Sequence, residues 1–339
     1  MTKYVAKIND LLKPKITEQE VILDLFAGCG GLSLGFEAAG YRTIGFEMDN
    51  AAASTYKKNL LGNCHAIKLD LDFEYPKAEI IIGGPPCQPF SVGGHQKGIE
   101  DARDGFPIFI DAVKKLKPKV FMFENVRGLL YTNKWYFELV ITELQKLGYI
   151  IDYKLLNAVN YGVPQNRERL FVFGHKARFN FPIPHMQKVT VGDAIGDIMF
   201  TIPPESKFLT PSMDTYVAKY EKASDCINPR DLYPEKPART LTCRNLAGAT
   251  GDMHRVRLKD GRRRRLLHRE AARLQSFPDW FDFTGNETQQ FNQIGNAVPP
   301  FLAYQLAIAL KECYKMDEIY NIEEILENNF KANKVLTLF

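Results

Sequence analysis

Short apolar runs alternate with amphipathic stretches along the first half of the chain. Strand-like runs lie at residues 21–25, 43–47, 80–82, 120–123, 149–156 and 170–173. Amphipathic stretches at residues 32–39, 51–58, 108–115 and 136–146 predict the helices between them. Strands that alternate with helices indicate a mostly parallel, doubly wound α/β sheet that is covered on both faces. In such a sheet, ligands bind beyond the carboxyl ends of the strands.

The pattern changes near Arg178. Prolines recur from residue 179 to about residue 236, and helical periodicity is lost there. We therefore predict that a second, loop-rich domain begins at this point. Helical patterns resume at residues 269–275 and 301–314, and the tail at residues 316–329 reads as an acidic helix.

The composition is ordinary for a globular protein, with 45% apolar and 25% charged residues, which excludes fibrous and disordered classes. The first residues contain no continuous apolar segment, so no signal peptide is predicted. No stretch of about 18 apolar residues is present, so no membrane span is expected. We therefore expect a cytoplasmic protein.

Six cysteines are scattered along the chain, at positions 29, 64, 87, 226, 243 and 313. They form no C-x-x-C pair and no Cys/His cluster with the spacing of zinc ligands, so we expect no metal. A reducing compartment also disfavours disulfides.

Positive charge is concentrated in one segment. Residues 236–275 contain twelve Lys and Arg against three Asp and Glu, a net charge of +9. Because the whole chain carries +4, the remainder carries about −5. A basic block on an acidic body indicates a polyanionic partner, the alternative being a solvated surface with spare arginines.

A glycine-rich turn follows the first strand. Residues 24–31, DLFAGCGG, open a helix, and glycine there lets the backbone approach a ligand closely. Glu47 ends the second strand, where it can accept from two ribose hydroxyls, and Asp70 can accept from an adenine amino group. The pattern indicates a nucleoside-containing cofactor, with a plain strand-to-helix turn as the alternative. Ser33 replaces the third glycine of the dinucleotide fingerprint, which counts against a dinucleotide.

Reactive residue types follow the later strands. Residues 83–94, GGPPCQPFSVGG, place Cys87 just past the strand at 80–82. Cys87 is either an inert apolar residue or a nucleophile. The glycines of the same segment predict a flexible lid. Glu124 follows the strand at 120–123, as a turn cap or an acid. Arg167 and Arg169 are two apart on an extended segment, so they point the same way and can grip one anionic or carbonyl group. A surface ion-pair network is the alternative for these charged residues.

Seven blocks stand in order along the chain: DLFAGCGG, a strand-end glutamate, GGPPCQPFS, FENVRG, QNRERLFVFG, REAARLQSFPDWF and QIGNAVPP. This series resembles the DNA (cytosine-5) methyltransferases of bacterial restriction-modification systems, over residues 20–312. The resemblance implies the S-adenosylmethionine-dependent methyltransferase fold with an inserted target-recognition domain. It places the catalytic and cofactor-binding domain at residues 1–178, the target-recognition domain at 179–285, and a returning C-terminal segment at 286–339.

The resemblance also implies the chemistry, which is methylation of C5 of a cytosine that has been flipped out of duplex DNA. Cys87 would attack C6, Glu124 would hold and protonate N3, Arg169 would contact O2, and Arg167 would support this pocket. S-Adenosylmethionine would be bound by the residues that match the cofactor motifs: Phe26, Gly28, Gly30, Glu47, Met48, Asp70, Pro86, Asn296 and Val298.

Double-stranded DNA is the partner that the resemblance implies. We expect the base-specifying residues within 201–257, and phosphate contacts from the run of arginines at 262–265. The predicted DNA-binding residues are Ser91, Arg239, Arg244, Arg257, Arg262, Arg263, Arg264 and Arg265. We expect a monomer, with a cognate restriction endonuclease as a genetic rather than a physical partner. The sequence departs from the family at Leu267 and His268, where a side-chain helix cap is usual, and this loss could cost about 1 kcal/mol.

Three other functions compete with this interpretation. A transfer-RNA cytosine-5 methyltransferase has the same fold and catalytic residues, but its Cys-Phe-Thr motif is absent from the recognition region. An inactive DNA-binding protein is disfavoured by the presence of Cys87, Glu124 and Arg169. A nicotinamide oxidoreductase is disfavoured by Ser33 and would leave Cys87 and Glu124 without a role.

Overall fold

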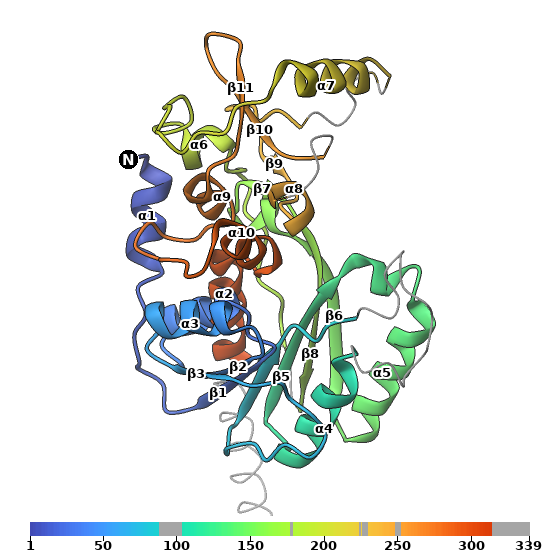
Figure 1. Cartoon of the computed structure of the whole chain (residues 1–339). Helices are drawn as coiled ribbons and strands as arrows, with labels where there is room; N and C mark the ends of the chain where they lie inside the picture. Colours follow the sequence, from blue (N-terminus) through green and yellow to red (C-terminus); the bar gives the residue numbers. More distant parts are fainter. Residues whose placement is uncertain (88–103, 177–178, 224, 226–229, 248–251, 314–339) are drawn as a thin grey trace, which may run out of the picture.

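The computed structural model describes the chain except residues 88–103, 177–178, 224, 226–229, 248–251 and 314–339. Its centre is a seven-stranded sheet with the strand order β3-β2-β1-β4-β5-β8-β6, in the lower half of Figure 1. The strands are β1 (Val21–Leu25), β2 (Arg42–Glu47), β3 (Asn63–Ala66), β4 (Ile80–Gly83), β5 (Val120–Val126), β6 (Ile150–Asn157) and β8 (Glu168–His175). All six predicted apolar runs are strands of this sheet, which confirms the α/β prediction.

Strand direction brings distant segments together at one edge of the sheet. β1 is parallel to β2 and β4, and β4 is parallel to β5, whereas β8 is antiparallel to both β5 and β6. Leu25 pairs with Gly83, and Gly83 pairs with Phe123. The glycine turn, the cysteine segment and Glu124 therefore begin side by side at the same carboxyl edge.

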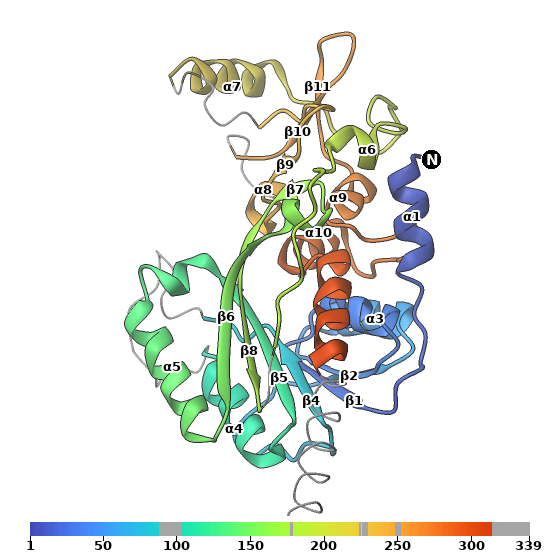
Figure 2. The same cartoon turned by 180° about the vertical axis from the view of Figure 1, so that it is seen from behind.

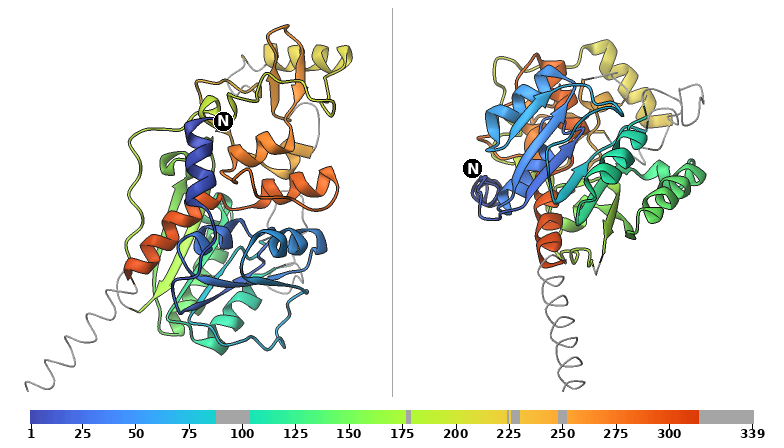
Figure 3. Two further views of the ribbon diagram at one scale, coloured as in Figure 1. Left: turned by 90° about the vertical axis from the view of Figure 1, so that its left-hand side faces the viewer. Right: turned by 90° about the horizontal axis from the view of Figure 1, so that it is seen from below.

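Helices cover both faces of the sheet because successive strand residues point to opposite sides. Ile22 and Ile80 pack against α2 (Gly31–Ala38) and a helix at residues 300–313. On the other face, Leu23 and Ile81 pack against α4 (Phe106–Leu116) and α5 (Lys134–Lys146). Figures 2 and 3 show the helix at residues 300–313 lying along the sheet. The C-terminal part of the chain thus packs back against the sheet that the first half of the chain forms.

α2 and the helix at residues 300–313 touch backbone to backbone. A Cβ added to Gly35 would lie 2.4 Å from the backbone nitrogen of Tyr304, which no side chain tolerates. Gly35 is therefore required by packing.

The region above the sheet is built from short elements (Figure 1). They are α6 (Val191–Ile195), α7 (Pro211–Ala223), β9 (Ala238–Arg239), α8 (Cys243–Ala247), β10 (Arg255–Arg257), β11 (Arg263–Arg265), α9 (His268–Leu274) and α10 (Glu287–Asn296). β10 and β11 form an antiparallel hairpin, and β9 pairs with β7 (Gln165–Asn166). The expectation that helical structure is lost throughout residues 179–236 is wrong at α7, which begins at a proline, a residue that fits the first helical turn.

A buried arginine, Arg264, stabilises this region through an ion pair. Arg264 is fully buried and donates to both carboxylate oxygens of Glu270, at 2.8 and 2.6 Å. Glu270 also accepts from the backbone nitrogen of Leu267, at 2.9 Å. The start of α9 therefore keeps one of its two capping bonds, although Leu267 offers no side-chain acceptor.

Candidate active site

The glycine turn at the end of β1 leaves one face of its backbone open. Phe26, Gly28 and Gly30 all have positive φ, at 62°, 56° and 86°. A Cβ added to Gly28 would meet no atom within 4 Å, so this face of the turn is open. The Gly28 amide donates to one carboxylate oxygen of Glu47, at 2.8 Å, and the Asp49 amide donates to the other, at 2.7 Å. The two amides fix the Glu47 carboxylate beside the turn.

Ser33, at the place of the third glycine, takes part in a buried chain of hydrogen bonds. Its hydroxyl donates to the Asp24 carboxylate at 2.6 Å and accepts from Tyr56 at 3.0 Å. Asp24 is 1% exposed, and its Oδ1 has no hydrogen-bond partner in the described part of the chain. Burial, which outweighs the bond from Ser33, raises the pKa of Asp24 to about 7.

We expect Asp24→Asn to remove a pH dependence of stability. Between pH 3.8 and about 7 the unfolded chain has lost this proton while the folded protein keeps it, so the wild-type protein loses stability as pH rises. The advantage of the variant in the free energy of unfolding should therefore grow from pH 5 to pH 7 and then level off. A shift of this size corresponds to about 4 kcal/mol in total. Urea unfolding at several pH values measures it, with the exposed Asp72→Asn as the control; parallel curves for Asp24→Asn and wild type would contradict the prediction.

The other predicted cofactor residues lie around the same edge. Met48 is 70% exposed at the end of β2. Asp70 is also exposed and lies beyond β3, which ends at Ala66. Pro86 is half-buried, and its carbonyl accepts from the Gly105 amide at 2.9 Å.

Residues 295–298, GNAV, come from near the other end of the chain and pack against the glycine turn. A Cβ added to Gly31 would lie 2.7 Å from the carbonyl oxygen of Val298, so this backbone nearly touches the start of α2. Val298 is buried, whereas Asn296 is exposed and its side-chain oxygen accepts from the Cys243 thiol at 2.8 Å.

Cys87 lies just past β4, where its backbone forms a bridge with Asp104. The Asn125 amide donates to the carbonyl of Pro85 at 2.9 Å and ties the cysteine segment to β5. Sequence reasoning missed this role of Asn125, although its place directly after Glu124 was a signal. Burial, aided by the Asp104 carboxylate, raises the pKa of the Cys87 thiol to about 12. A thiol with this pKa is protonated at neutral pH in the protein alone.

Glu124 and Arg169 face each other across β5 and β8. The Arg169 Nε lies 2.9 Å from Glu124 Oε1, and the two side chains are 15% and 12% exposed. Burial raises the pKa of Glu124, while the charges of Arg169 and Arg167 oppose that shift. The Glu124 carboxyl group therefore keeps its proton to higher pH than an exposed glutamate does, as a general acid requires.

Arg167 points into the protein rather than into the same open site as Arg169. It is 1% exposed and donates to the carbonyls of Leu241 and Gly295, at 2.7 and 3.2 Å. The expectation that Arg167 and Arg169 grip one ligand group is therefore wrong. Burial, with repulsion from Arg169, lowers the pKa of Arg167 to about 9. Arg167 thus joins the segment between β7 and β8 to the upper region.

The four arginines at 262–265 do not form one exposed phosphate-binding surface. Arg264 is buried against Glu270, so its predicted phosphate contact is wrong. Arg263 is 15% exposed and pairs with three carboxylates, on Asp214, Glu221 and Asp231. Arg262 is exposed and pairs with Asp260 at 2.7 Å.

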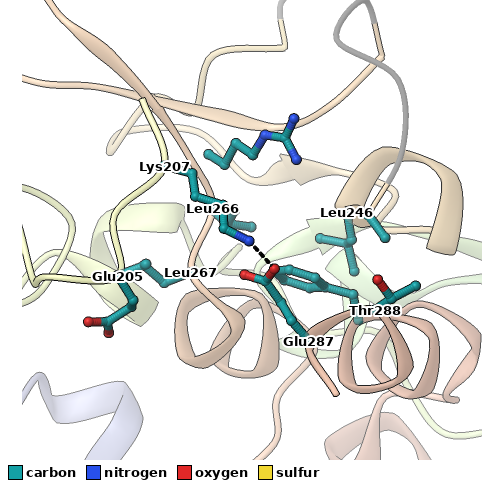
Figure 4. Close-up of a pocket in the computed structure, with 10 residues that line it drawn as sticks. Glu205, Lys207, Leu246, Leu266, Leu267, Glu287 and Thr288 are labelled. Carbon is teal, nitrogen blue, oxygen red and sulfur yellow. Dashed lines mark hydrogen bonds and ion pairs between the residues drawn. The ribbon is translucent and has the colours of Figure 1, made fainter. Parts of the chain in front are cut away.

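Arg265 lines a pocket of about 250 Å³ away from the sheet edge (Figure 4). An ion pair between Lys207 and Glu287 crosses this pocket, and Leu246 and Phe291 form part of its wall. Of the remaining predicted DNA-binding residues, Arg257 is exposed at the end of β10. Arg239 and Arg244 lie near Asp252. Ser91 and the predicted lid lie outside the described residues.

No group of three or more His, Cys, Asp or Glu side chains among the described residues could hold a metal ion. No described helix is long and apolar enough to cross a membrane.

Comparison with known proteins identifies the family of this site. The C-5 cytosine-specific DNA methylase family matches residues 21–312. The chain belongs to this family. It is 57% identical over 303 residues to the Type II methyltransferase M.AplI of Arthrospira platensis, covering 88% of each chain. It is 36% identical over 328 residues to M.FnuDI of Fusobacterium nucleatum, covering 86% of this chain and 94% of that one.

A solved structure shares the fold. The structure matches the methyltransferase Dnmt2 of S. pombe with a TM-score of 0.68 at 16% identity, covering 87% of this chain and 99% of that one. The protein is thus a methyltransferase that acts at C5 of cytosine in DNA, and it uses a methyl donor. The comparisons disfavour the transfer-RNA alternative.

Proposed function

We propose that the protein is a Type II modification methyltransferase that uses S-adenosylmethionine and methylates one cytosine of a specific duplex sequence. The juxtaposition of Cys87, Glu124 and Arg169 with the open glycine turn at one sheet edge carries this proposal. Two relatives that match 86–88% of the chain bear the name Type II methyltransferase. A cytoplasmic location, a monomeric state and a cognate endonuclease remain predictions.

The residues of the glycine turn fit S-adenosylmethionine. Glu47 offers the remaining lone pairs of its fixed carboxylate to ribose hydroxyls, and exposed Met48 can cover an adenine ring. The open face of Gly28 admits the ligand backbone, and Val298 closes the other end. When bound, the cofactor supplies an electrophilic methyl group.

The cytosine pocket divides the activation of the ring between two groups. The Cys87 thiol loses its proton to solvent and the thiolate forms a bond to C6, while Glu124 donates a proton to N3, which takes up the electron pair displaced from the ring. C5 gains electron density by this addition and becomes able to take a methyl group. Solvent then takes the C5 proton, the electron pair of that C–H bond re-forms the C5–C6 double bond, and the sulfur leaves as a thiolate. Return of the N3 proton to Glu124 restores the aromatic ring.

Arg169 holds this arrangement in place. Its Nε pairs with the Glu124 carboxylate. We infer that another N–H of its guanidinium donates to the cytosine O2. The target base must leave the helical stack to reach the pocket, at a cost of a few kcal/mol.

Transfer of a tritiated methyl group from S-adenosylmethionine to duplex DNA tests this function. We expect label in DNA and none in transfer RNA, and sequencing of the methylated sites should return one short motif. Label in transfer RNA instead of DNA would overturn the proposal.

A further inference from the structure

Three arginines surround one carboxylate in the upper region. The guanidinium groups of Arg230, Arg239 and Arg244 lie 3.5, 3.9 and 3.9 Å from the carboxylate of Asp252. We call these four residues the arginine cluster. Their side chains range from mostly buried to open, with Arg230 14% exposed, Arg239 36% and Arg244 81%. Arg230 and Asp252 were not among the predicted site residues.

The arginine cluster is joined to the segment that leads into Arg169. Arg239 lies in β9 and pairs with Asn166 of β7, the residue before Arg167. The Thr240 hydroxyl donates to the Asn166 carbonyl at 2.5 Å, and Arg167 donates to the carbonyl of Leu241. Residues 239–241 therefore connect the arginine cluster to the residues directly before β8.

Arg230 is held firmly from its other side. It donates to the Tyr220 hydroxyl at 2.9 Å, and its guanidinium carbon lies 4.9 Å from the centre of the Tyr220 ring. Tyr220 belongs to α7, and the next residue, Glu221, pairs with Arg255 and Arg263 of the hairpin at 3.3 and 3.2 Å. The arginine cluster is thus built on a fixed frame of α7 and the hairpin.

Arg239 has a donor that lacks an acceptor. Its Nη1 is buried without a hydrogen-bond partner in the described part of the chain, because 3.9 Å to Asp252 is too long for a hydrogen bond. A buried donor without a partner costs free energy, so it indicates that a ligand supplies the acceptor. Burial, with repulsion from Arg230, also lowers the pKa of Arg239.

We propose that the arginine cluster reads a guanine of the recognition sequence, with Arg239 donating to the base and Asp252 orienting the guanidinium groups. This inference rests on the proposed function. Guanine presents O6 and N7 together in the major groove, and the planar fork of arginine matches these two acceptors. A phosphate fits the same fork, so the variants below separate base reading from phosphate binding.

Selection of binding sequences from a duplex library with random positions tests the proposal at fixed salt. The wild-type protein should enrich guanine at defined positions, and Arg239→Ala should lose the preference at one of them. Replacing that guanine by 7-deazaguanine, which lacks N7, should weaken wild-type binding by about 5- to 150-fold and Arg239→Ala binding no further. Arg42→Ala is the matched control, because Arg42 is exposed at the opposite end of β2.

Two further variants separate base reading from phosphate binding and from misfolding. Arg239→Lys keeps the charge but lacks the fork, so it should lose the same preference while keeping the wild-type melting temperature. Asp252→Asn should weaken the guanine preference if the carboxylate orients the arginines. Tighter binding of Asp252→Asn to every sequence, with its preference unchanged, would overturn the proposal.

Two other results would also overturn the proposal. In the first, Arg239→Ala loses affinity equally for all sequences and shows a smaller salt dependence of binding. In the second, selection with the wild-type protein enriches no guanine. The selection measures binding and needs no methyl transfer. If the protein selects a guanine through Arg239 but methylates no DNA, the proposed function is contradicted while the proposal for the arginine cluster still holds.

Discussion

Cys87→Ser is expected to lower the rate of methyl transfer to DNA on the order of 10³-fold or more. A serine hydroxyl is a far weaker nucleophile than a thiolate, so the bond to C6 would not form at a useful rate. The effect should be on the chemical step, because Cys87 is half-buried and Ser occupies less space. Single-turnover labelling of duplex DNA measures it.

A duplex with 5-fluorocytosine at the target position adds a second measurement. Fluorine at C5 cannot leave as a proton does, so the wild-type protein should remain covalently attached to the DNA. Cys87→Ser should give no attached species on a denaturing gel. Cys313→Ala is the control, because that thiol is buried in the apolar cluster around residues 300–313. Attachment that persists in Cys87→Ser would show that another residue is the nucleophile.

The sheet and the meeting of the site residues at its edge were predictable from the sequence. Runs such as residues 80–82 and 120–123 are apolar throughout, as buried parallel strands are, and few other structures fit them. Once these strands are parallel and adjacent, Cys87 and Glu124 must lie at the same edge. α7 was not predictable in this way, because among its thirteen residues only Val217 is buried, so it shows little apolar periodicity.

The roles of individual charged residues could not be predicted. Arg262, Arg263 and Arg264 are consecutive, yet one is exposed, one pairs with three carboxylates and one is fully buried. Their carboxylate partners lie from two to 49 residues away along the chain. Local sequence carries no signal of such contacts, so a count of arginines overstates the charge that is free to meet DNA.

Protonation could not be predicted either, because it depends on burial, which local sequence does not show. The composition around Asp24 gives no sign that its carboxylate is enclosed beside Ser33 and Tyr56. The raised pKa of Cys87 comes from burial and, to a lesser degree, from Asp104, which lies 17 positions further on. The sequence indicates which groups can react. The packed structure sets which of them carry a proton before substrate arrives.

Glu124→Gln is expected to lower the rate of methyl transfer by about 10²- to 10⁴-fold, the range of general acid catalysis. Glutamine can still form a hydrogen bond with the base, but it has no proton to give to N3. Attack at C6 depends on that proton, so attachment to 5-fluorocytosine should slow by a similar factor. Affinity for cognate DNA should change far less, which a binding titration with the same duplex measures.

The pH dependence provides a test that loss of packing would not mimic. Because the pKa of Glu124 is raised, the wild-type carboxyl keeps its proton to higher pH than an ordinary glutamate and loses it as pH rises further. The wild-type rate should therefore fall on that alkaline limb, and Glu124→Gln should lack the limb. Glu168→Gln is the matched control, because Glu168 is in a neighbouring exposed ion pair with Arg127 at 2.8 Å, worth at most about 1 kcal/mol. Equal losses of binding and rate in Glu124→Gln, with the alkaline limb retained, would show that Glu124 only holds Arg169 in place.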